Sequence, residues 1–156
     1  MIQNKINNDI ELVELEAKHA AITPYLRRAD VEEIQAFSGI SPAVAVAFSI
    51  AQSRPGFCIL YREKPAVIFG AAPIENHKGC IWLLGTDEVY NHPVTFYRES
   101  KKLLQVLMQD YNYLENYVDA RNTLSLRWLK WLGFTIKDAQ IMGVENKLFH
   151  HVFIHS

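Results

Sequence analysis

Two apolar runs separated by one helix-length segment constrain this chain more than any other feature. The run CIWLLGT (80–86) is apolar on both faces, as in a central strand that is covered on both sides. The segment HPVTFYRESKKLLQVLMQDY (92–111) keeps an approximate helical stripe, and LENYVDA (114–120) is the next strand-like run. A strand, a helix and a strand in this order predict two parallel strands joined by a right-handed crossover.

The segments before this unit predict further strands and helices. IELVELEA alternates enough to be a first strand, and FCILY and AVIFGAAPI, joined by REKP, indicate a hairpin. Between IELVELEA and FCILY we expect three helices. Asp30 and Glu33 form a capping box for the second helix, and Ser41 and Pro42 begin the third. With FTI and LFHHVFIH as closing strands, the order predicts a single α/β domain over residues 1–156. Its sheet is mixed and mostly antiparallel, with one parallel crossover and helices on both faces.

The stretch NTLSLRWLKWLGF (122–134) predicts one more helix, with Asn122 as N-cap and Gly133 at its end. Trp128 and Trp131 are three positions apart and so share a face. The first interpretation is a helix enclosed between the sheet and a neighbouring helix, because such helices are apolar all round. The alternative is a tryptophan patch that docks another protein chain.

Charge and composition exclude several classes of function. Sixteen basic and seventeen acidic residues leave a net charge of -1, which offers no electrostatic argument for a nucleic-acid or membrane-surface partner. No apolar stretch approaches the roughly 20 residues that a membrane span needs. We expect Cys58 and Cys80 to be free thiols in apolar runs. The terminal histidines lack an identifiable third ligand, so we expect no zinc site; they are His150, His151 and His155.

The element order and two runs, WLLGTD (82–87) and LENYVDARN…WLKWLGF, resemble the GNAT superfamily of acyl-CoA-dependent N-acyltransferases. More narrowly, they resemble a phage and prophage family typified by a small internal virion protein of short-tailed phages. The resemblance covers nearly the whole chain and is weakest before Ser38. It implies acetyl-CoA as the cofactor, in a groove formed by Leu84, Gly85, Thr86, Asn122 and Ser125. It also implies phage virion or host proteins as partners, in the host cytoplasm during infection or inside the virion.

The chemistry of that superfamily is only partly supported by these residues. Its members hold the diphosphate on a glycine-rich loop before the crossover helix, whereas GTDEVYNHP (85–93) has one glycine, two carboxylates and a proline. A tyrosine seven positions after the capping asparagine protonates the departing thiolate, and the matching residue here is Leu129. His92, Asp87 and Glu88 are weak substitutes, because a helix cap and favourable charges at a helix N-terminus explain them better.

We therefore predict a GNAT-like accessory protein of a phage, an internal virion or assembly protein whose catalytic equipment is largely absent. The alternative is an active acetyl-CoA-dependent N-acetyltransferase that acts on a host or phage amine. A second alternative is a module that binds a host protein through Trp128 and Trp131. The acceptor, the partner and the oligomeric state are left open.

Overall fold

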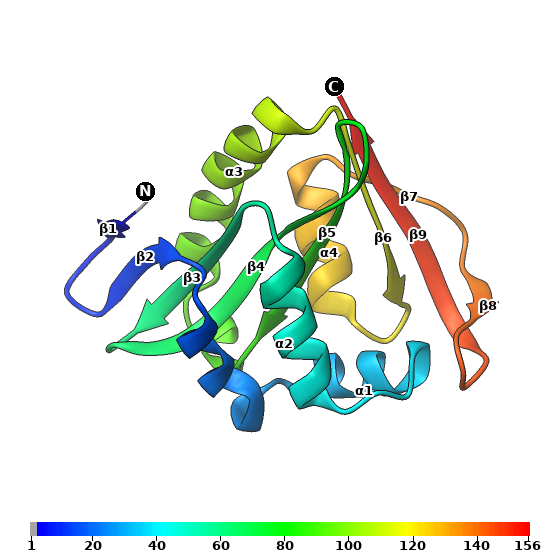
Figure 1. Cartoon of the computed structure of the whole chain (residues 1–156), viewed down its shortest axis with the longest axis horizontal. Coiled ribbons are helices and arrows are strands. Elements are labelled where there is room, and N and C mark those ends of the chain that lie inside the picture. The colour runs from blue at the N-terminus through cyan, green and yellow to red at the C-terminus, as the bar shows by residue number, and fades with distance from the viewer. Residues whose placement is uncertain (1–2) are drawn as a thin grey trace.

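The computed structural model describes residues 3–156 and shows one mixed sheet with helices packed against it (Figure 1). The sheet order is β1-β2-β3-β4-β5-β6-β9-β7, with β8 paired to β9 outside this path. The strands are β1 (Gln3–Lys5), β2 (Ile10–Glu14), β3 (Gly56–Tyr61), β4 (Lys64–Glu75), β5 (Lys78–Gly85), β6 (Tyr113–Asp119), β7 (Thr135–Ile136), β8 (Gln140–Met142) and β9 (Lys147–His155). Among the described strands only β5 and β6 pair in parallel, which confirms the predicted topology.

Two apolar clusters hold helices against the two faces of the sheet. The helical elements are η1 (Ala17–Tyr25), α1 (Arg28–Phe37), α2 (Pro42–Gln52), η2 (Asp87–Tyr90), α3 (Pro93–Asp110) and α4 (Thr123–Leu132). Phe57 and Phe69 of the sheet belong to the cluster that includes residues of α3 and α4. Their neighbours Cys58 and Ile68 belong to the cluster that includes residues of η1 and α2. Alternate strand residues thus point to opposite faces, and both faces are covered, as predicted.

The local signals of the sequence are confirmed at three helix ends and wrong at one. The Ser41 hydroxyl accepts a hydrogen bond from the Val44 amide at 3.2 Å, and Asn122 caps α4 in the same way. Gly133 ends α4 in the left-handed conformation, with φ of 103°. Asp30 is not an N-cap, because α1 begins at Arg28 and the Asp30 carboxylate is bonded elsewhere in the fold.

Cys58 and Cys80 are free thiols, as predicted. Burial raises the pKa of Cys58 to about 12 and that of Cys80 to about 11, so both thiols are protonated and unreactive near neutral pH. Within residues 3–156 no single helix is long and apolar enough to cross a membrane, and α1 with α2 meets that test only as a pair bent by 86°.

Candidate functional site

The parallel strands β5 and β6 separate after only a short paired stretch. They pair from Lys78 opposite Tyr113 to Cys80 opposite Glu115, and the remaining residues of both strands have no ladder partner across the gap. Figure 1 shows the two strands diverging, and α4 is seen through the gap. In open α/β sheets the carboxyl ends of parallel strands are where ligands bind. The split between β5 and β6 is therefore the candidate site.

A cavity with about 260 Å³ of empty space, part of it open to solvent, lies in this split. It is lined from α1, β5, β6 and α4 by Glu33, Ile81, Trp82, Leu83, Asn116, Val118, Ser125, Trp128 and Leu129. The Asn116 side-chain amide donates a hydrogen bond to the Ile81 carbonyl at 2.6 Å, which spans the two strands beyond their ladder. The cavity is narrow, and one polar side chain bridges it.

Glu33 is the titratable side chain that lines this cavity. Its pKa is raised to about 8, first because burial disfavours the charged carboxylate and then because Asp30 and Asp119 are negative neighbours. Asn122 opposes this shift, since its side-chain amide donates to Glu33 Oε2 at 2.9 Å. Glu33 can therefore gain and lose a proton close to neutral pH, which suits a general acid or base.

A buried ion pair fixes Glu33's helix to the end of β5. Arg27 donates to Asp30 through Nε at 3.0 Å and Nη2 at 2.6 Å, a two-point contact between buried side chains. Asp30 Oδ2 also accepts from the Gly85 amide at 2.9 Å, and the Arg27 amide donates to the Gly85 carbonyl at 2.8 Å. Arg27 reaches the Asn122 side-chain oxygen at 3.3 Å. The network joins α1, the end of β5 and the N-cap of α4 by hydrogen bonds.

Trp128 also lines this cavity, and its indole N–H is a buried donor. Its side chain is 2% exposed, and its indole N–H has no hydrogen-bond partner among the described residues. The ring stacks on Phe96, with centroids 5.8 Å apart, and meets Phe69 edge-on at 6.4 Å. A buried polar group left without a partner costs about 1–3 kcal/mol. A bound group with an acceptor atom would remove that cost.

In the loop between β5 and α3, several backbone amides already donate hydrogen bonds within the protein. The Thr86 amide donates to the Ala66 carbonyl, and the Glu88 amide donates to the Thr86 hydroxyl. The Val89 and Asn91 amides donate within η2, to Thr86 and Glu88. A diphosphate needs several free amides at a helix N-terminus. This loop also carries two carboxylates, so its residues do not fit that group.

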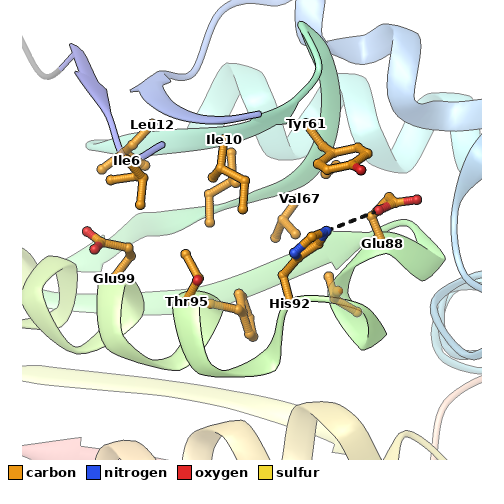
Figure 2. Close-up of a pocket in the computed structure, with 13 residues that line it drawn as sticks. Ile6, Ile10, Leu12, Tyr61, Val67, Glu88, His92, Thr95 and Glu99 are labelled. Carbon is orange, nitrogen blue, oxygen red and sulfur yellow. Dashed lines mark ion pairs between the residues drawn. The ribbon is translucent and has the colours of Figure 1, made fainter. Parts of the chain in front are cut away.

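The side chains predicted as weak catalytic candidates lie away from the split. His92 and Glu88, with Nε2 and Oε2 3.5 Å apart, line a second cavity between α3 and the strands β2–β4 (Figure 2). That cavity, with about 430 Å³ of empty space, is otherwise mostly apolar, as Ile10 and Val67 in Figure 2 illustrate. Asp87 is exposed and lines neither cavity. His92 stands at the N-cap of α3, but its side chain makes no capping hydrogen bond.

The five predicted groove residues are placed in different ways. Ser125 lines the cavity, and Asn122 lies directly behind Glu33. Leu84 belongs to the apolar cluster on the α2 face, and the amides of Gly85 and Thr86 are bonded to Asp30 and Ala66. Reasoning from sequence missed the roles of Glu33, Asn116 and Trp128. An asparagine inside an otherwise apolar strand was the available signal for Asn116, because asparagine is depleted in strands.

Trp128 follows the first interpretation, an enclosed helix, and the alternative of a docking patch made by both tryptophans is wrong for it. Trp128 is buried under α3, whereas Trp131 is 49% exposed and packs its ring against Tyr97 at 5.2 Å. Three residues along a helix turn the side chain by about 60° from its starting direction. At the border of the core that angle suffices to bury one ring and leave the other at the surface.

His150 and His151 each contact a different partner. His151 Nε2 lies 2.7 Å from Glu115 Oε1, and His150 Nδ1 lies 2.7 Å from the Lys137 carbonyl. In the described part of the chain, no three or more His, Cys, Asp or Glu side chains are grouped so that they could hold a metal ion.

Solved structures of other proteins are similar to this chain in fold. No protein-family model matches the chain, and no curated protein sequence matches it. A Salmonella typhimurium acetyltransferase described as modifying the N-terminal serine of a ribosomal protein is similar in structure, with a TM-score of 0.71, 12% identity and 99% of each chain covered. A GNAT-family acetyltransferase from Bacillus anthracis has a TM-score of 0.70 at 13% identity, covering 99% of this chain and 98% of its own.

A microcin self-immunity acetyltransferase, solved with acetyl-CoA and AMP, has a TM-score of 0.68 at 16% identity, with 97% of this chain and 95% of its own covered. At such identities the likeness establishes the fold and nothing finer. The chain has the GNAT acetyltransferase fold, as predicted. The narrower resemblance to a phage family stays a prediction.

Proposed function

We propose that this protein binds an acyl thioester between β5 and β6 and transfers the acyl group to an amine, as an acyl-CoA-dependent N-acyltransferase. The observation that carries the proposal is Glu33, a carboxyl with a pKa of about 8 that lines the split. An amine must lose its proton before it attacks a carbonyl, and a base near neutral pH supplies that step. The names of the structural neighbours, all acetyltransferases, agree with this chemistry.

The residues fit one part of an acyl-CoA molecule and not another. The edge of β5 that faces β6 has no ladder partner beyond Cys80, and the Trp128 N–H lacks an acceptor, so amide and thioester carbonyls of a pantetheine arm can be bound there. The loop of residues 86–92 does not fit the diphosphate, because four of its amides are already bonded and it carries two carboxylates. Affinity must then come mainly from the arm.

In this site each polar residue has a distinct task. Glu33, once ionised, accepts the proton of the incoming ammonium, and Asn122 holds its Oε2 by a hydrogen bond of 2.9 Å. The acyl thioester supplies the acyl group. Leu129 supplies no proton to the departing thiolate, whose parent thiol has a pKa of about 8.5 in the absence of neighbours. We expect a slow reaction that is fastest at mildly alkaline pH.

The second candidate function is that of a protein with the same fold and no acyltransferase activity. Three observations favour this second candidate. The loop of residues 86–92 has few free amides, the Asn116 side chain spans the split, and position 129 holds a leucine that cannot donate a proton. In this case the protein would be an accessory protein of a phage or prophage, internal to the virion or active in assembly. The resemblance of residues 82–87 and 114–134 to such a family supports that setting. Mass spectrometry of purified particles would test it, and detection of the chain only in infected cells would contradict the virion role.

A transfer assay separates the two candidates. Radiolabelled acetyl-CoA is incubated with peptides that carry free α-amino groups or lysines and with polyamines, between pH 6 and pH 9. We expect transfer above the uncatalysed rate, and a loss of about 100-fold in kcat/KM for Glu33→Gln. Glu32→Gln is the matched control, since Glu32 is the preceding residue and pairs with Arg28 and Arg121 at the surface. No transfer to any amine would leave only the second candidate.

A further inference from the structure

We infer that the indole N–H of Trp128 is the hydrogen-bond donor that binds a carbonyl oxygen of the acyl-thioester arm in the cavity between β5, β6 and α4. This inference rests on the proposed function and deepens it, because it names a residue that recognises the acyl donor. The chain has leucine, not an acid, at position 129, and Trp128 places a different donor one residue earlier on the same helix.

The Trp128 indole N–H is buried without a hydrogen-bond partner among the described residues. The Trp128 side chain is 2% exposed, yet no acceptor among residues 3–156 lies within hydrogen-bond reach of its Nε1. Phe96 and Phe69 pack against the ring, so the N–H cannot turn away without disturbing the core. Native proteins rarely leave a buried donor in this condition, and the exceptions often have a functional role.

The side chains of Asn116 and Glu33, which also line the cavity, are already hydrogen-bonded. The Asn116 side chain donates to the Ile81 carbonyl and accepts from the Tyr117 amide. Glu33 Oε2 accepts from the side-chain amide of Asn122 and the backbone amide of Asp119. The indole is a neutral group that donates and never accepts. It therefore selects an acceptor such as a carbonyl oxygen over an ammonium group, which places it on the acyl-donor side of the reaction.

Trp128 and Glu33 line one cavity. The same cavity contains Glu33, so a carbonyl bound by Trp128 lies in the space that the proposed base also borders. An indole N–H does not ionise in the accessible pH range, so Trp128 orients the donor and leaves proton transfer to Glu33. We expect changes at Trp128 to weaken binding without moving the pH profile, and changes at Glu33 to do the reverse.

The test uses Trp128→Phe, which keeps an aromatic ring and removes the N–H, with Trp131→Phe as the control on the exposed face of the same helix. Calorimetric titration with acetyl-CoA and with S-acetyl-pantetheine should show about five- to twentyfold weaker binding for Trp128→Phe and a change within twofold for Trp131→Phe. Without ligand, Trp128→Phe should unfold at a lower temperature, because it removes buried atoms from a ring packed against Phe96 and Phe69. The titrations are therefore made at a temperature at which both proteins are fully folded, where a purely structural role of the N–H would leave the affinity of Trp128→Phe at the wild-type value.

A measurement on the wild-type chain covers the case in which Trp128→Phe does not fold. The indole ¹⁵N–¹H resonances of Trp82, Trp128 and Trp131 are followed during titration with S-acetyl-pantetheine. Trp82 donates to Ser53 Oγ at 2.7 Å and Trp131 is half exposed, so both serve as references. The Trp128 resonance should move most on binding.

The possible outcomes separate this inference from the proposed function. Acyl transfer with an unmoved Trp128 resonance, or with wild-type affinity in Trp128→Phe, would overturn the inference and leave the function standing. Ligand binding with the expected Trp128 effects but no transfer to any amine would support the inference and defeat the function. An absence of binding to either thioester at millimolar concentration would overturn both.

Discussion

Replacing Glu33 with glutamine should stabilise the protein at alkaline pH, and by an amount that depends on pH. Folding raises the pKa of Glu33 from 4.5 to about 8, chiefly through burial. Between these values the folded state holds a proton that the unfolded state has released. The favourable contribution of Glu33 is therefore complete below pH 4.5 and is lost as the pH rises towards 8.

The magnitude follows from the size of the displacement. Each pKa unit corresponds to about 1.4 kcal/mol, so the full displacement would correspond to about 5 kcal/mol. About 4 kcal/mol of this falls between pH 5 and pH 9, because the unfolded carboxyl is already partly ionised at pH 5. Glutamine has nearly the same shape and can still accept the Asn122 hydrogen bond, but it has no charge to bury.

The assay is urea unfolding of the wild type, Glu33→Gln and the control Glu32→Gln at pH 5, 7 and 9. The advantage of Glu33→Gln over the wild type should grow by about 4 kcal/mol from pH 5 to pH 9. Glu32 pairs with Arg28 at 2.7 Å on the surface, so Glu32→Gln should differ from the wild type by less than about 1 kcal/mol at each pH. A difference between Glu33→Gln and the wild type that does not vary with pH would refute the raised pKa, and with it the case for Glu33 as the base.

Three further predictions follow from the network and the loop. Arg27→Met should lower the free energy of unfolding by about 3–5 kcal/mol in chemical denaturation, because it leaves the buried Asp30 without its partner; Arg28→Met, at an exposed pair, should cost less than about 1 kcal/mol, and equal losses would contradict a buried network. The double change Asp87→Asn with Glu88→Gln should tighten acetyl-CoA binding about three- to tenfold at low salt and have little effect at 1 M salt, measured by calorimetry; no change at low salt would show that the loop does not face the nucleotide. S-acetyl-pantetheine should bind the wild type within about tenfold of acetyl-CoA, since one or two weak contacts amount to about 1.4 kcal/mol; a preference of 100-fold for acetyl-CoA would mean that the diphosphate is held.

Most of the fold could be predicted because its signals are local. The parallel pair follows from two apolar runs around one helix, and the ends of α4 follow from Asn122 and Gly133, whose capping roles need only neighbours along the chain. The helices on both faces follow from strands that are apolar on both faces.

The site was harder to predict because its contacts join distant parts of the chain. Asp30 and Glu33 have the spacing of a capping box, but Asp30 binds the Gly85 amide, 55 positions away, and Glu33 meets Asn122, 89 positions away. Sequence spacing carries no information on such pairs. Trp128 and Trp131 share a predicted helix face, and only the packing of α3 decides which ring is buried. The composition of residues 85–93, with one glycine and one proline, predicted in part that this loop offers few free amides. The hydrogen bonds within η2 could be seen only in the structure.

The pH dependence of acyl transfer tests the central claim most directly. We predict that kcat/KM for acetyl transfer to an amine rises with pH and reaches half its maximum near the Glu33 pKa of about 8, and that Glu33→Gln loses this rise. An absence of transfer above the uncatalysed rate at every pH, or the same rising limb in Glu33→Gln, would contradict it.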